Sequence, residues 1–168
     1  MADPTIPELA KAITDTQTGL NIVWTMVAGF LVMFMQAGFA LVETGLTRAK
    51  NAAHTMGMNF LVYPIGIIGF YFIGFGLQMG GVGAVFGEQA ILVKEFTVSL
   101  FGKDFGLFGM TGFALHPLTL YTPGIAAMFL FQMVFMDTTC TIPTGAAAER
   151  WKFMSFVIFS FAISTIIY

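Results

Sequence analysis

The stretch GIAAMFLFQMVFMDTTCTIPTGAAAERW, residues 124–151, decides the fold class of this chain. It begins as a nearly unbroken apolar run and ends in the charged residues Glu149 and Arg150. Because an apolar helix of about 20 residues crosses the hydrocarbon core of a bilayer, the run is a candidate membrane span. The carboxylate of Asp137 lies in the middle of this run, where a charged group is costly. Asp137 is therefore a candidate functional residue.

The composition of the whole chain supports a membrane protein. Of 168 residues, 57% are hydrophobic and only 10% are charged, whereas a soluble domain carries about 25% charged residues. We therefore predict an all-α membrane protein, a multi-span helical bundle embedded in a lipid bilayer. The net charge of −2 and the scattered basic residues give no indication of a nucleic-acid partner.

Four apolar segments are predicted to span the membrane, at approximately residues 20–45, 56–79, 123–143 and 152–168. Residues 1–18 are polar, and we expect an exposed tail with a short helix around residues 8–14. A long connection, residues 80–122, is rich in Gly and Phe. Its segment 88–100 fits either an interfacial helix or a pair of strands. The last apolar segment is short for a span, so we expect the chain to be a piece of a longer polypeptide.

The basic residues predict the orientation of these spans. The two tight turns between spans carry four of them: Arg48, Lys50, Arg150 and Lys152. The long connection carries only Lys94 and Lys103. Because cytoplasmic loops are enriched in Lys and Arg, we expect the tight turns in the cytoplasm and the N-terminus outside, with residues 80–122 as an external loop.

Two stretches resemble the ammonium transporter family of Amt, Mep and Rh proteins. Residues 37–60, AGFALVETGLTRAKNAAHTMGMNF, resemble the end of the family's first membrane helix and the R-x-K-N turn after it. Residues 131–150, FQMVFMDTTCTIPTGAAAER, resemble the third helix, in which an F-Q-x-x-F pair precedes G-A-x-A-E-R.

The resemblance implies a homotrimer in the cell (inner) membrane, with eleven helices and one narrow pore in each subunit. This chain would be the N-terminal part of such a subunit, about four transmembrane helices. The family's pore histidines and outer-vestibule tryptophan find no match in it, and His54 and His116 do not occupy the twin-histidine positions. We expect no cofactor and no metal site, because no ligand cluster accompanies either histidine.

The resemblance also assigns roles to two phenylalanines. Phe131 matches the residue that helps form the outer ammonium recruitment site, and Phe135 matches one of two rings stacked across the pore entrance. Ammonium over an aromatic face gains cation–π energy of ~2 kcal/mol when desolvated. Burial penalises the charged form, so ammonium can lose its proton and pass a gate that excludes hydrated ions.

Three carboxylates need separate interpretation. Asp137 stands where many transporters in the family have a small uncharged residue. It is either a packing residue bonded to threonines or a neighbouring helix, or a polar pore residue with a proton or ion role. Glu43, near the inner end of the first span, is expected to pair with Arg48 or Lys50. Glu149 is expected to cap the helix that follows it.

These observations favour transmembrane transport of ammonium or ammonia through a hydrophobic pore. One alternative is the membrane module of an ammonium sensor, coupled to a cytoplasmic regulatory or signalling partner. Another is a structural subunit of a membrane complex. An enzyme is the least favoured class, because the sequence shows no nucleophile–base pair, metal cluster or phosphate loop.

Overall fold

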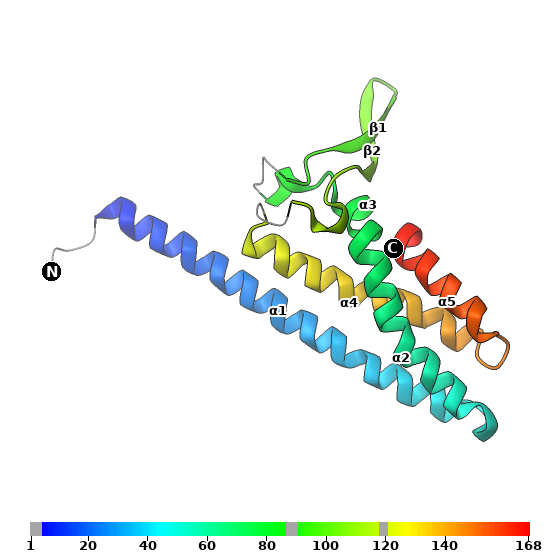
Figure 1. Cartoon of the computed structure of the whole chain (residues 1–168). Coiled ribbons are helices and arrows are strands. Elements are labelled where there is room, and N and C mark those ends of the chain that lie inside the picture. Colours follow the sequence, from blue (N-terminus) through cyan, green and yellow to red (C-terminus); the bar gives the residue numbers. More distant parts are fainter. Residues whose placement is uncertain (1–4, 87–90, 118–120) are drawn as a thin grey trace.

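The computed structural model describes residues 5–86, 91–117 and 121–168, which form a helical bundle with a β-hairpin at one end (Figure 1). The helices are α1 (Ile6–Leu46), α2 (Ala52–Gly69), α3 (Phe75–Met79), α4 (Pro123–Ala146) and α5 (Phe153–Ala162). A π-helical turn, Phe70–Gly74, joins α2 to α3, and a second one, Ile163–Ile167, extends α5. The apolar segments predicted as spans are thus largely helical. Among the described residues, the helical segments Ile6–Leu46, Ala49–Met79 and Pro123–Ala146 are long and apolar enough to cross a membrane, whereas Phe153–Ile167 is shorter.

Helix α1 begins earlier than the sequence suggested, so the prediction of a separate polar tail is wrong. The Thr5 backbone N–H donates to Glu8 Oε2 at 2.7 Å, and Pro7 lies in the first turn, where its fixed φ favours a helix. The 41 residues extend over about 60 Å at 1.5 Å per residue, twice the thickness of a hydrocarbon core. The N-terminal turns consequently project beyond the other helices (Figure 1).

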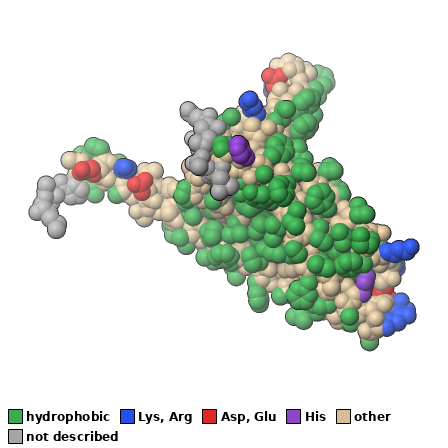
Figure 2. Space-filling model, viewed as in Figure 1, with side chains coloured by type: hydrophobic (Ala, Val, Ile, Leu, Met, Phe, Trp, Pro, Cys, Tyr) green, Lys and Arg blue, Asp and Glu red, His purple; other side chains and the backbone are tan. Residues whose placement is uncertain are grey.

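Helix α4 is the centre of the bundle and packs against α1 and α2, while α2 also packs against α5. The apolar side chains buried in this core include Met58, Val62, Phe70, Phe75, Ile125, Val134, Met136, Cys140 and Phe156. Polar side chains are buried beside them, among them Asn59, Asp137 and Thr141. Large apolar side chains also cover the outer surface of α1, including Trp24, Leu31 and Phe34. On the face shown in Figure 2, hydrophobic side chains form a broad band and charged ones gather at its ends. This distribution suits a bundle surrounded by lipid.

Glycines let α2 and its continuation approach neighbouring helices closely. A Cβ at Gly66 would lie 2.8 Å from Met136 Sδ of α4. A Cβ at Gly74 would collide with the backbone carbonyl oxygen of Ser164, in the π-helical turn after α5. Small residues at such contacts permit the close backbone approach that helix packing in membranes relies on.

A β-hairpin occupies much of the long connection between α3 and α4. Strand β1 (Glu95–Leu100) pairs antiparallel with β2 (Lys103–Gly109) around a two-residue turn. Both turn residues have positive φ, 54° at Phe101 and 74° at Gly102, as two-residue hairpin turns commonly require. The structure thus favours the strand pair over the interfacial helix, although residues 88–90 of the segment 88–100 lie outside the described residues. The multi-span helical membrane fold is confirmed, and the described part of the chain adds this hairpin to it.

Candidate functional site

Helix α4 carries Phe131 and Phe135 one turn apart, and their rings are in contact. The ring centroids lie 4.9 Å apart with the planes tilted by 47°. Both side chains are half-buried, so part of each ring is accessible from outside the described bundle. The helix that holds them begins at Pro123, after Thr122 in extended backbone conformation, which is a favourable helix start. The four-residue spacing therefore brings the two rings together on one face of α4.

Contacts on both sides of α4 fix the position of this aromatic pair. A Cβ at Gly29 of α1 would lie 3.8 Å from the Cα of Phe131, so the two helices pass very close to each other there. On another side, the Tyr168 hydroxyl donates to Gln132 Oε1 at 2.6 Å and ties the turn after α5 to α4. Phe129, two residues before Phe131, stacks on Phe70 with centroids 5.8 Å apart. The faces of such rings attract cations electrostatically.

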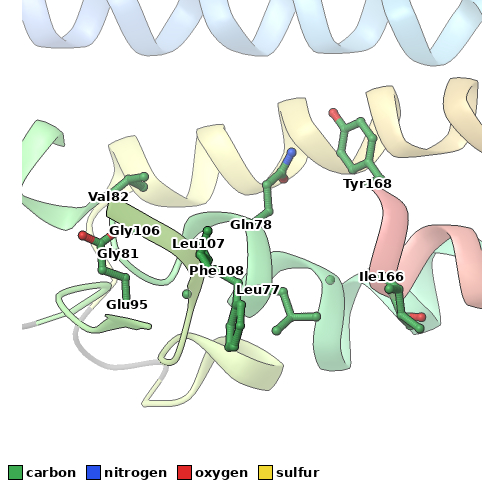
Figure 3. A pocket seen from close by; sticks show the side chains of 13 residues that line it. Leu77, Gln78, Gly81, Val82, Glu95, Gly106, Leu107, Phe108, Ile166 and Tyr168 are labelled. Carbon is green, nitrogen blue, oxygen red and sulfur yellow. The ribbon is translucent and has the colours of Figure 1, made fainter. Parts of the chain in front are cut away.

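A cavity among the described residues lies away from the aromatic pair (Figure 3). It has a volume of about 670 Å³ and lies between the hairpin, α3 and the turn after α5. Its walls include Gln78, Glu95, Phe108, Ile166 and Tyr168, but neither Phe131 nor Phe135. The aromatic pair is therefore a partly exposed surface feature of α4 and does not line this cavity.

Asp137 is almost completely buried on α4, with 2% of its surface exposed. Its Oδ1 has no hydrogen-bond partner within the described part of the chain. The neighbouring threonines bond elsewhere: Thr138 to the carbonyl of Val134 and Thr139 to the carbonyl of Phe135. The predicted pairing of Asp137 with threonines is therefore not found. The two roles predicted for Asp137, in helix packing or in the pore, stay predictions.

Glu43 lies inside a three-helix junction and does not pair with Arg48 or Lys50, so that prediction is wrong. Its Oε2 accepts a hydrogen bond of 2.7 Å from Asn59 Nδ2 of α2. Thr144 Oγ1 of α4 lies 2.7 and 2.9 Å from the two carboxylate oxygens. The physical reason is that α1 continues to Leu46, which keeps Glu43 facing α2 and α4 while Arg48 lies beyond the helix end.

Gln36 extends this junction by two further contacts, and sequence analysis missed it. Its Nε2 donates to the Asn59 carbonyl oxygen at 2.9 Å, and its Oε1 accepts from Thr141 Oγ1 at 3.1 Å. Gln36 and Glu43 are seven residues apart in an apolar helix, so they share one face. Two polar residues at that spacing are the signal that would have found the junction.

The two short turns at the other end of the bundle from the hairpin are joined by an ion pair. The Arg48 backbone N–H donates to Glu149 Oε1 at 2.7 Å, and Arg48 Nε donates to Oε2 at 2.8 Å. These hydrogen bonds, together with the positive charge of Arg48, lower the pKa of Glu149 to about 2. Glu149 does not cap α5, whose N-cap is Lys152, so the capping prediction is wrong.

The long apolar helices, the charged ends and the aromatic pair on the central helix define an integral membrane protein of the multi-span helical class. More particularly, the chain belongs to the Ammonium Transporter Family, whose model matches residues 23–168. It is 34% identical over 168 residues to the ammonium transporter Amt2 of Archaeoglobus fulgidus, covering 99% of this chain and 31% of that protein. It is also 34% identical to the putative ammonium transporter 1 of Caenorhabditis elegans, covering 97% of this chain and 27% of that protein.

A solved structure described as a sensor Amt protein has the same fold in this region. It superposes with a TM-score of 0.72 at 31% identity, over 92% of this chain and 33% of the sensor chain. The chain thus spans about a third of the length of the relatives it matches.

Proposed function

We propose that residues 1–168 are the N-terminal part of a protein that moves ammonium or ammonia across the cell membrane through a hydrophobic pore. The observation that carries the proposal is the contact between Phe131 and Phe135, at 4.9 Å, on the central helix of a chain that belongs to this family. The names of the relatives, ammonium transporters, support the same substrate.

The two rings have distinct roles in the proposal. Phe131 offers an aromatic face to an arriving ammonium ion, where the attraction is worth ~2 kcal/mol once the ion is desolvated. Phe135, one turn further along α4, closes the entrance to hydrated ions. An ion that passes must leave water, and this penalises its charged form. Ammonium can respond by losing a proton, whereas K⁺ cannot, and this difference gives the selectivity.

The proposed orientation has the N-terminus and the hairpin outside and the two short turns in the cytoplasm. The Arg48–Glu149 pair supports it, because it holds the two turns richest in basic residues at one end of the bundle. The proposed assembly is a homotrimer, as the family resemblance implies. The apolar outer surface of α1 provides a surface for lipid or a neighbouring subunit.

The experiment is uptake of methylammonium by cells that express the complete protein, with Phe135→Ala and Phe131→Ala compared at equal membrane abundance. Phe60→Ala is the control, because it removes a phenyl ring that is 70% exposed on α2. We expect Phe131→Ala and Phe135→Ala to reduce either the uptake or the selectivity against K⁺. Phe60→Ala should change neither the uptake nor the selectivity. Wild-type behaviour in both test variants would contradict the assigned roles.

The second candidate is a sensor module, in which ammonium binds without crossing. The observation that favours it is the likeness to the sensor Amt protein. Purified complete protein in liposomes distinguishes the two: a sensor would bind methylammonium at the aromatic pair and give no flux, whereas a transporter would give both.

A further inference from the structure

Asp137 belongs to a polar face of α4 that is separate from the aromatic pair. At 3.6 residues per turn, Asp137 lies about 160° around the helix from Phe135. Thr141 and Thr144 follow it at intervals of four and three residues, so the three side chains share one face. The two threonines contact Gln36 and Glu43 in the three-helix junction. Asp137 thus continues this polar face one turn further into the bundle.

Within residues 5–86, 91–117 and 121–168, no positive charge balances the Asp137 carboxylate. The titratable groups in electrostatic range are Tyr63 of α2 and Cys140 of α4 itself. Helix α1 has no titratable side chain in residues 20–42, and residues 153–167 on the α5 side have none either. Among the residues that the structure describes, no cation forms an ion pair with Asp137.

A buried carboxylate in this state has few chemical options. Moving an isolated ionised carboxylate into an apolar interior is so costly that such a group normally becomes neutral instead. A metal cation would need several oxygen ligands, yet the buried neighbours of Asp137 on α4 include Val134, Met136 and Cys140. A proton needs neither a cavity nor further ligands, so it is the ligand that this site can accommodate.

We propose that Asp137 is an internal proton-binding site of the bundle, distinct from the aromatic pair. The carboxylate and a hydronium ion give a carboxylic acid and water: an O–H bond forms on Asp137, and one O–H bond of the hydronium ion breaks. The three-helix junction, from Thr141 through Gln36 and Asn59 to Glu43, lies between this site and the end with the short turns. This inference concerns a bound proton and stands whether the complete protein is a transporter or a sensor.

The test is infrared spectroscopy of the complete protein in lipid bilayers across acidic and neutral pH. We expect a carbonyl stretch of a protonated, desolvated carboxylic acid at neutral pH, present in the wild type and in Glu43→Gln and absent in Asp137→Asn. Glu43→Gln is the matched control, since it neutralises the other carboxylate of this region without touching Asp137.

A further variant keeps the test decisive if Asp137→Asn does not fold. Asp137→Glu retains the carboxyl group and should shift the band without abolishing it. The proposal is overturned if the folded wild type shows no carboxylic acid band that changes with Asp137, because the carboxylate would then be ionised and balanced by another group. A band that disappears in Glu43→Gln and persists in Asp137→Asn would also overturn it.

Discussion

Arg48 and Glu149 are 101 residues apart in sequence, and the Glu149 carboxylate contacts both the backbone and the side chain of Arg48, between the short turns of the bundle. The carboxylate accepts hydrogen bonds from the backbone N–H and the guanidinium of the same arginine. The turn after α1 and the turn before α5 are therefore held together. Since α4 ends directly before the second turn, this contact also anchors the helix that carries the aromatic pair.

The ion pair predicts a specific dependence of stability on pH. The pKa of Glu149 falls from 4.5 to about 2 in the folded protein, so the folded state favours the ionised carboxylate. The contribution is present in full above pH 4.5 and is lost as the pH falls towards 2. We expect Glu149→Gln to lower the Tm at neutral pH and to approach the wild-type Tm as the medium is acidified. A difference in Tm that stays constant over this range would contradict the prediction.

Removing Glu43 should destabilise the three-helix junction. In Glu43→Ala, the Thr144 hydroxyl can still donate to the carbonyl oxygen of Thr141, whereas Asn59 Nδ2 keeps only the Thr55 carbonyl oxygen and one of its N–H groups loses its acceptor. One unsatisfied buried donor costs about 1–3 kcal/mol. Glu43→Gln keeps an oxygen acceptor and should cost less. Thermal unfolding in detergent measures both variants. Equal Tm values for Glu43→Ala and the wild type would show that the junction contributes nothing to stability.

The close approach at Gly74 predicts a large effect of a single methyl group. A Cβ there meets the backbone carbonyl of Ser164, which cannot rotate away as a side chain could, so Gly74→Ala should cost about 1–3 kcal/mol. Gly57→Ala in α2 is the matched control, because a Cβ at Gly57 has no atom within 4 Å. The free energy of unfolding of the two variants should differ clearly. Indistinguishable values would mean that the contact between this π-helical turn and the one after α5 is looser than described.

Much of the bundle was predictable because an apolar helix long enough to cross a bilayer leaves an unmistakable pattern in sequence. The spacing of Phe131 and Phe135 likewise determines that their rings share one helix face. The start of α1 was missed because it depends on a local capping interaction between Thr5 and Glu8. The capping pattern covers only four residues, and the polar composition of the residues around it favours an exposed tail.

The partners of the carboxylates were not predictable from local sequence. Glu43 has basic residues a few positions away, yet its partners are Asn59 and Thr144, brought to it by helix packing. Arg48, which lies in the turn after α1, pairs instead with Glu149 in the turn before α5. Such contacts depend on the rotation of each helix about its axis, which an apolar run of residues does not specify.

The most direct test of the proposed function is flux through the purified complete protein in liposomes. An imposed ammonium gradient and an equal potassium gradient would be compared. The account predicts flux with ammonium and none above background with K⁺, and a loss of this discrimination in Phe135→Ala. Ammonium binding without flux, or equal flux of both ions in the wild type, would contradict transport through an aromatic gate.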